Sequence, residues 1–298
     1  MQLKTFIYDA FTETAFGGNV AGVVIIPAGV ETSLLQKIAA EINAPTTGFV
    51  ELLGTTTYRT RFFSATSEMD MCGHVTIGVA CALVENGFVE YGPLLQQTLA
   101  GPVQVAVTQS KRQITVAMQQ RLPAYTEFPI DPSQLYKLLG VEDQALDPRF
   151  RFGCASTGLM HLFVAVKAEA LPQLQPNNPE LYTFSKEHKL DTIGVFSVAG
   201  KQGDSSVSAE LRDLCHGVGN PEESASGTTN GALASFLFHR GWFGSQAPQV
   251  TLNTVQGRQM GRPSSIQTTL SITNGVVSKV LVGGSAKRIL EGMLYLPE

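Results

Sequence analysis

Two apolar segments of similar design stand out in the pattern of hydrophobic and polar positions. One follows a polar corner at Cys72, and the other follows a similar corner at Ser226. Each segment is long enough for a helix and is apolar on nearly every face, so the pattern predicts two buried helices, at about 74–86 and 228–240. Other elements have to enclose a helix of this kind.

Short runs typical of strands surround each predicted helix. In the first half they cover residues 3–8, 20–26, 49–52, 57–63 and 96–117, and in the second half 161–166, 192–198, 206–214, 250–252, 265–272 and 278–284. A loop-like stretch that begins at Leu122 separates the two sets. We therefore predict an α+β protein with an N-terminal domain at 1–122 and a C-terminal domain at 123–298, and leave open that the last strand packs across the boundary.

The two halves also align with each other. At a constant offset of 154 residues (227 − 73 = 154), Gly73 corresponds to Gly227, and the first apolar run corresponds to the second. Gly87 and Gly241 then stand at the same place after each helix, where glycine commonly ends a helix. The shared small-residue corner, apolar helix and glycine stop predict a duplicated architecture.

The composition restricts the function. Of the 298 residues, 43% are hydrophobic and 15% are charged, which fits a well-packed soluble protein. A formal net charge of −4 provides no basic surface for nucleic acid, and no apolar run is long enough to cross a membrane. The N-terminal segment alternates like a strand and lacks the pattern of a signal peptide, so we expect a cytoplasmic protein with reduced cysteines.

Neither a metal nor a nucleotide cofactor is indicated by the sequence. The four cysteines lack the spacing of metal ligands, no GxGxxG motif follows a strand, and no GxxxxGK[ST] motif occurs. We therefore expect the chemistry to come from the side chains and the backbone.

The start of each predicted helix offers free backbone N–H groups and the positive end of the helix dipole. If both starts face one cleft, Gly73, Gly227 and Thr228 can hold a carboxylate and stabilise the charge that develops when a proton leaves the adjacent carbon. Cys72 stands where a helix dipole favours a thiolate, and a thiolate can act as the base. Cys72 also fits a second interpretation, a small buried residue that fills a corner.

Other polar residues lie near these corners. His74 can be an acid, a base or a donor to substrate, or it can cap a turn. Glu223 can supply a carboxylate to the cleft or simply favour the helix dipole. Ser226 is an ordinary helix cap that can also bind substrate, and Asn19 fits either a turn or a substrate contact.

Motifs spread along nearly the whole chain resemble the PhzF-like (phenazine-biosynthesis isomerase) family. These motifs are residues 6–12 with 16–19, residues 61–64 with 68 and 72–74, residues 256–264, and residues 282–286 with 291–292. Val20 departs from the proline that is usual in the family. The family shares its fold with diaminopimelate epimerase and proline racemase. The resemblance therefore implies two similar domains, each a curved, barrel-like, mainly antiparallel sheet wrapped around a central helix.

The resemblance also implies a function. It predicts a cofactor-independent isomerase that moves a proton on a small carboxylic or amino acid, with an active site between the domains, and a homodimer. By position in the motifs, the family's histidine falls on His74, its first backbone donor on Gly73 and its aspartate on Glu223. Its Gly–Ser pair falls on Gly227 and Thr228.

One departure from the family concerns the reaction itself. The family's catalytic glutamate falls on Thr46, which does not exchange a proton near neutral pH. Racemases of the wider fold have a cysteine at each helix start, whereas here Cys72 matches one of them and Ser226 stands at the other. Three interpretations therefore stay open: an isomerase or a Cys72-dependent dehydratase, a one-base epimerase that uses His74 or Glu223, and a non-catalytic protein that binds small acids.

Overall fold

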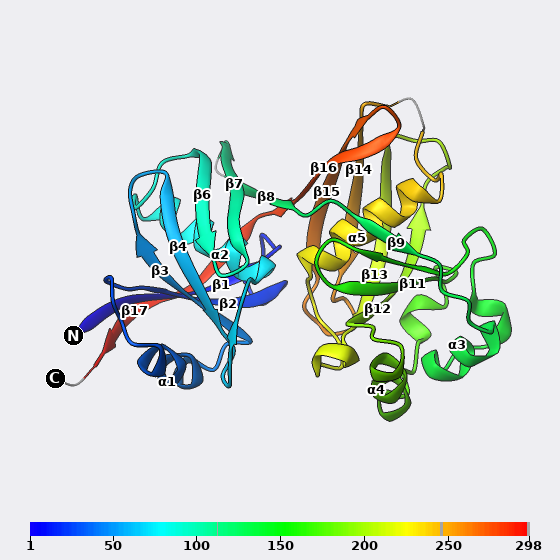
Figure 1. Cartoon of the computed structure of the whole chain (residues 1–298), viewed down its shortest axis with the longest axis horizontal. Coiled ribbons are helices and arrows are strands. Elements are labelled where there is room, and N and C mark those ends of the chain that lie inside the picture. The colour runs from blue at the N-terminus through cyan, green and yellow to red at the C-terminus, as the bar shows by residue number, and fades with distance from the viewer. Residues whose placement is uncertain (112, 245–246, 297–298) are drawn as a thin grey trace. The chain divides into compact units, whose positions relative to one another are not determined.

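The chain forms two compact units in the computed structural model, which describes residues 1–111, 113–244 and 247–296 (Figure 1). Unit 1 comprises Met1–Gln119 and Gly283–Glu298, and unit 2 comprises Gln120–Val282. Each unit has its own strands and its own central helix.

Unit 1 is built from the two ends of the chain. Its helices are α1 (Thr32–Ile42) and α2 (Gly73–Glu85). Its strands are β1 (Gln2–Ala10), β2 (Asn19–Ile25), β3 (Thr46–Leu52), β4 (Thr57–Phe63), β5 (Glu68–Met69), β6 (Gly92–Thr98), β7 (Gly101–Ser110), β8 (Gln113–Gln120) and β17 (Ala286–Tyr295).

Unit 2 repeats this plan with one additional helix before its second strand. Its helices are α3 (Pro132–Leu139), α4 (Asn178–Glu187) and α5 (Gly227–His239). Its strands are β9 (Ala124–Thr126), β10 (Gly153–Ser156), β11 (Met160–Ala165), β12 (Thr192–Ala199), β13 (Ser206–Leu214), β14 (Gln249–Gln256), β15 (Ser264–Thr273) and β16 (Val276–Gly284).

Both units use the same succession of strand pairings. In unit 1, β1–β2 is antiparallel, β2–β3 parallel, β3–β4 antiparallel, β4–β6 parallel and β6–β7 antiparallel. In unit 2, the pairs β10–β11, β11–β12, β12–β13, β13–β14 and β14–β15 show the same alternation. Each parallel pair requires a crossover, which α1 and α2 supply in unit 1 and α4 and α5 in unit 2. The two similar α+β units predicted from the sequence are confirmed.

A helix lies at the centre of each unit, and the strands curve around it (Figure 1). Every residue of α2 from His74 to Val84 is buried, and so is nearly all of α5 as far as Leu237. These side chains are mostly apolar on every face, so covering them with strands removes a large apolar area from water. The predicted helices at about 74–86 and 228–240 are confirmed, and each begins and ends one residue earlier than expected.

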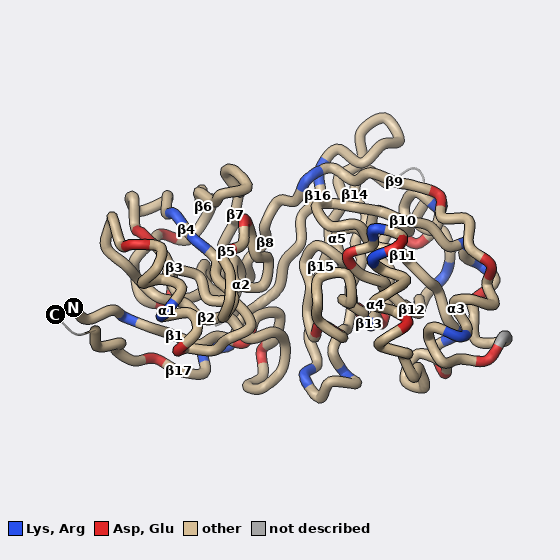
Figure 2. Tube along the Cα trace, turned by 60° about the horizontal axis from the view of Figure 1, so that its bottom comes forward, with Lys and Arg blue, Asp and Glu red and all other residues tan. Residues whose placement is uncertain are grey.

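The two central helices contain almost no charged residues. The only charged residue of α2 is Glu85 at its C-terminal end, and α5 contains none of Lys, Arg, Asp or Glu. Figure 2 shows residues of both signs distributed over the other elements of each unit. The glycines after the helices, Gly87 and Gly241, have φ of 68° and 69°, a left-handed conformation that stops a helix at little cost.

The last strand belongs to unit 1. β17 pairs antiparallel with β1 over most of its length, from Gln2 opposite Tyr295 to Ala10 opposite Ala286. The sequence alone counted this strand with the C-terminal half and left open that it packs elsewhere. Its pairing with β1 brings the end of the chain back to the first strand.

The corresponding leucines Leu83 and Leu237 provide a test of the two cores. Both side chains are fully buried, so Leu83→Ala and Leu237→Ala should each lower the free energy of unfolding by about 2–5 kcal/mol in urea titrations. Leu99, which is 60% exposed, is the control, and Leu99→Ala should change that free energy by less than about 0.5 kcal/mol. Equal losses in the three variants would contradict this description of the cores.

Candidate active site

The two central helices begin with the same backbone geometry. Cys72, the N-cap of α2, has φ −142° and ψ 118°, and Ser226, the N-cap of α5, has φ −133° and ψ 115°. Gly73 and Gly227 are the first helical residues. The N–H groups of the first turn have no acceptor within a helix, so each start directs hydrogen-bond donors and the positive end of a dipole outward.

Three predicted residues meet at the start of α2. Cys72 Sγ lies 3.4 Å from His74 Nδ1 and 3.9 Å from His74 Nε2, and Asn19 Nδ2 lies 3.3 Å from the same Nδ1. All three residues are buried, and the Cys72 side chain makes no cap hydrogen bond. With the His74 proton on Nε2, the one lone pair of Nδ1 can accept either from the Asn19 amide or from the Cys72 thiol. This arrangement suits transfer of the thiol proton to the imidazole.

Thr46 lies at the same edge of the sheet as Asn19. Asn19 begins β2, Thr46 begins β3, and the parallel register places Ala21 opposite Thr46. Thr46 is only 4% exposed. Its hydroxyl group can donate or accept a hydrogen bond but does not serve as an acid or base near neutral pH.

The predicted residues of unit 2 form the start of α5. Ser226 Oγ accepts a hydrogen bond from the Thr229 N–H at 3.4 Å, and it lies 3.2 Å from Thr228 Oγ1 and 2.9 Å from Thr229 Oγ1. The Thr157 hydroxyl donates to the Thr228 carbonyl at 3.2 Å. Ser226 therefore caps the helix and also joins two neighbouring hydroxyl groups.

Glu223 lies in the segment just before α5. Its N–H donates to the Asp213 carbonyl at 3.0 Å, and its carbonyl accepts from Gln256 Nε2 at 2.8 Å. The buried Gln256 also accepts from the Ser226 N–H at 3.3 Å and from Asn230 Nδ2 at 2.9 Å. One buried glutamine thus fixes the Glu223 segment to the helix start.

An arginine–glutamate pair precedes each helix start. Arg61 donates two hydrogen bonds of 2.7 Å to Glu68, and Arg212 donates two, of 3.0 and 2.7 Å, to Glu222. Glu68 and Glu222 correspond at the offset that relates the two halves. The same bidentate pair therefore fixes the approach to each helix.

A buried polar cluster that sequence reasoning missed lies behind the start of α5. Asp213 is fully buried, and its Oδ2 accepts from the Thr229 hydroxyl at 2.6 Å. His161, also fully buried, has Nδ1 2.7 Å from Thr192 Oγ1 and 3.4 Å from Thr229 Oγ1. Among the described residues, Asp213 Oδ1 and His161 Nε2 have no hydrogen-bond partner. The feature of the sequence that could have revealed this cluster is Asp213 itself, a carboxylate within the strand predicted at 206–214.

Burial determines the protonation of this cluster. Burial raises the pKa of Asp213 to about 6, although hydrogen bonds from Thr229, Thr192 and Cys215 act in the opposite direction. Burial lowers the pKa of His161 to about 3, so its imidazole is neutral at pH 7. His161 therefore lies in the core with one ring nitrogen bonded and the other not.

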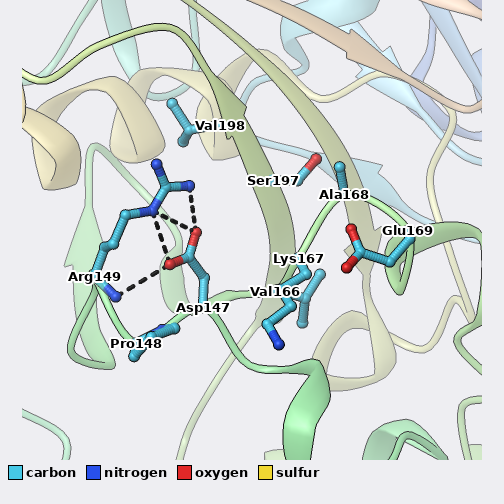
Figure 3. Close-up of a pocket in the computed structure, with 9 residues that line it drawn as sticks. All are labelled: Asp147, Pro148, Arg149, Val166, Lys167, Ala168, Glu169, Ser197 and Val198. Carbon is cyan, nitrogen blue, oxygen red and sulfur yellow. Dashed lines mark hydrogen bonds and ion pairs between the residues drawn. The ribbon is translucent and has the colours of Figure 1, made fainter.

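A separate hollow of about 260 Å³ lies in unit 2 (Figure 3). Asp147, Arg149, Lys167 and Glu169 supply its charges, and the Arg149 guanidinium is bound to Asp147 and lies 5.1 Å from the centre of the Trp242 ring. None of the residues predicted for the active site lines this hollow. The hollow is therefore distinct from the predicted active site at the helix starts.

Residues 1–111, 113–244 and 247–296 contain neither a cluster of metal-binding side chains nor a membrane-spanning helix. Nowhere in these ranges do three His, Cys, Asp or Glu side chains gather in a way that could hold a metal ion. Their helices are also too short or too polar to span a membrane.

The fold of this chain is that of solved PhzF-family and proline racemase structures. A phenazine biosynthesis protein of the PhzF family from Bacillus anthracis matches with a TM-score of 0.86 and 23% identity, over 99% of this chain and 100% of that one. A probable proline racemase from Agrobacterium radiobacter K84 matches with a TM-score of 0.62 and 13% identity, over 99% of this chain and 93% of that one. These likenesses confirm the predicted diaminopimelate epimerase-like fold class.

Sequence comparison then defines the family. The family model described as phenazine biosynthesis-like protein, PhzC-PhzF, matches residues 8–292. An uncharacterized isomerase of Deinococcus radiodurans is 31% identical over 290 residues, which are 95% of this chain and 92% of that protein. The chain belongs to the PhzC-PhzF family, and its relatives place it among the isomerases.

The pair that precedes α5 provides a test of how firmly the helix start is held. Glu222→Gln leaves the Arg212 side chain, which is only 9% exposed, without its charge partner, so the free energy of unfolding should fall by about 3 kcal/mol in denaturant titrations. The control is Glu51→Gln, because its partner Arg59 is 50% exposed and the loss should stay below about 1 kcal/mol. A loss at Glu222 as small as that at Glu51 would show that the buried pair does not fix this segment.

Proposed function

We propose that the chain is a cofactor-independent isomerase that moves a proton on a small carboxylic or amino acid. The observation that carries the proposal is the matched geometry of the two helix starts. One start holds a thiol–imidazole pair, Cys72 and His74, with Asn19 beside it. The other holds the hydroxyl groups of Ser226 and Thr228.

In the proposed reaction Cys72 is the base. Its proton passes to His74 Nδ1, and the resulting thiolate removes a proton from the carbon next to the substrate carboxylate. The same pair returns a proton to another carbon of the molecule. Substrate and product are then isomers, and no co-reactant is consumed.

The substrate carboxylate is bound by backbone donors in this proposal. The N–H groups of Gly73, Gly227 and Thr228 hold it and stabilise the negative charge that develops. We propose, as the family resemblance implies, that the two units share this site and that Glu223 and Ser226 orient the substrate. Thr46 contacts the substrate without transferring a proton.

Two departures from the family support alternative functions. Ser226 stands where racemases of the wider fold have a second cysteine, which favours a Cys72-dependent dehydratase or a one-base epimerase as the second candidate. Thr46 stands at the position of the family's catalytic glutamate, which favours a non-catalytic protein that binds small acids.

The four free cysteines support our proposal that the protein works in the cytoplasm.

Deuterium exchange tests the proposed role of Cys72. The protein should introduce deuterium from heavy water next to the carboxylate of at least one member of a panel of amino, hydroxy and unsaturated acids, measured by mass spectrometry. Cys72→Ala should reduce that rate by about 10²–10⁴-fold, the usual contribution of a general base. Cys81→Ala is the control, because Cys81 is buried in the same helix away from its start and should leave the rate unchanged.

The products of this experiment separate the candidate functions. An unchanged product mass, apart from deuterium, indicates isomerisation or epimerisation, and loss of water indicates a dehydratase. Thermal stabilisation by an acid without exchange favours the binding protein. Full exchange by Cys72→Ala would reject the thiol as the base.

We propose further that the chain forms a homodimer, as the family resemblance implies. Met293 and Tyr295, which are 44% and 71% exposed, lie on the same face of β17. Large apolar side chains that share one face of an exposed strand are typical of an interface, and a second copy is the partner we expect to cover them.

Light scattering tests this interface. The native chain should elute with about twice the mass of 32.0 kDa, and Met293→Lys combined with Tyr295→Lys should shift it to the monomer, because two buried like charges oppose association. Leu99→Lys, at an exposed leucine outside β17, should leave the dimer intact. A dimer that persists in the double variant would place the interface elsewhere.

A further inference from the structure

A line of hydrogen bonds joins a buried carboxyl group to the start of α5. Asp213 Oδ2 lies 2.6 Å from Thr229 Oγ1, Thr229 Oγ1 lies 2.9 Å from Ser226 Oγ, and Ser226 Oγ lies 3.2 Å from Thr228 Oγ1. Asp213 and Thr229 are fully buried, whereas Ser226 and Thr228 are half-buried at the helix start. The line therefore runs from the core to the place where we propose that the substrate binds.

Each hydroxyl group in this line has one proton to donate. An ionised Asp213 can only accept, so the one proton of Thr229 goes to Asp213 and the Thr229 hydroxyl no longer donates to Ser226. A protonated Asp213 instead donates to Thr229, Thr229 donates to Ser226, Ser226 donates to Thr228, and the Thr228 proton is directed to a ligand.

We infer that Asp213 is a positioning residue that sets the direction of this hydroxyl chain, so that α5 donates a hydroxyl proton to a bound carboxylate more strongly while Asp213 is protonated. The inference rests on the proposed function in one respect, namely that the start of α5 binds an acid. By linkage, a carboxylate that binds there should in turn favour the protonated form of Asp213.

Unit 1 shows that the fold does not require this chain of hydroxyl groups. Phe62 corresponds to Asp213, because each pairs with a glycine of the preceding strand, and Val75 corresponds to Thr229 at the offset of the two halves. Phe62 and Val75 are fully buried apolar residues. Placing a carboxyl group where the twin unit has a phenyl ring costs stability, which points to a role in function.

Other titratable and charged groups surround Asp213, from several elements. They are His161 on β11, Arg212 on β13, Cys215 just after β13, and Glu222 and Glu223 before α5. Burial keeps His161 neutral by lowering its pKa to about 3, and burial raises the pKa of Cys215 well above its usual value. Arg212 is paired with Glu222. With its pKa raised to about 6, Asp213 changes charge in the range between pH 5 and pH 8.

Acetate is the probe for the first test, because it carries the carboxylate without a reactive neighbour. The shifts of the Gly227 and Thr228 amide resonances in NMR titrations give its dissociation constant at pH 5 and pH 8. In the native protein binding should weaken by about tenfold or more over this range, since Thr229 turns its proton from Ser226 to Asp213 as Asp213 becomes ionised.

Two variants test whether this pH dependence comes from the chain of hydroxyl groups. Asp213→Asn should bind acetate equally well at both pH values, because its amide donates to Thr229 throughout. Thr229→Val breaks the chain with the residue that the twin helix carries at this position, and its affinity should also be constant. Both variants keep the other titratable groups His161, Glu222 and Glu223. Acetate binding that weakens equally with pH in the native protein and in Asp213→Asn would overturn the inference. Binding by the native protein that does not depend on pH would also overturn it.

A ligand-free measurement separates this inference from the proposed function. The ¹³Cγ resonance of Asp213 reports its titration directly. Ser226→Ala should lower the titration midpoint by about 0.3 pH units or more, because Thr229 loses the acceptor to which it donates while Asp213 is protonated. Ser235→Ala is the control, since Ser235 lies in the same helix and donates to the Gly231 carbonyl.

The two measurements together decide every case. A shifted midpoint in Ser226→Ala without acetate binding supports the chain and argues against the carboxylate site of the proposed function. A midpoint that moves in neither serine variant overturns the inference, whether or not acetate binds. Circular dichroism melting curves check that each variant is folded.

Discussion

The architecture depends on the burial of two helices that are apolar on every side. Strands can cover such a helix along its length, but the N–H groups of its first turn still need polar partners. In unit 2 the Ser226 side chain accepts from the Thr229 N–H, and the buried Gln256 accepts from the Ser226 N–H. In unit 1 the buried Gln96 accepts from the Thr76 hydroxyl of the first turn, and in both units an arginine–glutamate pair lies on the segment before the helix. These contacts hold the positive end of a helix dipole at a fixed point in each unit, a geometry that suits anion binding.

The two units share this framework and differ in the chemistry they place on it. The start of α2 carries a thiol and an imidazole, whereas the start of α5 carries hydroxyl groups backed by the Asp213 carboxyl. That carboxyl group has a cost: its folded-state pKa of about 6 exceeds the ordinary 3.8, so the folded state binds the proton more tightly. Stability is therefore lost as the pH rises from 3.8 to about 6 and is not regained above it. Unit 1, with Phe62 at the corresponding place, avoids this cost.

Sequence patterns predicted the elements whose signal is local and missed the contacts that depend on register. The apolar runs of α2 and α5 located both central helices to within one residue, because no other element keeps every face apolar over that length. Cys72 and His74 were found together because they lie on one turn of the chain. Asp213 was missed because a carboxylate is normally read as exposed, and only the pairing of β12 with β13 and the packing of Thr229 bury it. Asn19 was suggested by its motif, but its contact with His74 depends on how β2 lies beside α2.

The departures at Thr46 and Ser226 bear differently on the reactions considered for this fold. Two-base inversion at one carbon requires a base and an acid on opposite faces of the substrate, and neither hydroxyl group can serve as one of them near neutral pH. Moving a proton between two carbons of the same molecule requires only one group that first takes the proton and then returns it on the same face. In the proposed function that group is the pair of Cys72 and His74, which lie 3.4 Å apart in one unit. The same two substitutions that argue against a two-base racemase are therefore compatible with the proposed isomerase, in which the hydroxyl groups bind and the thiol–imidazole pair transfers the proton.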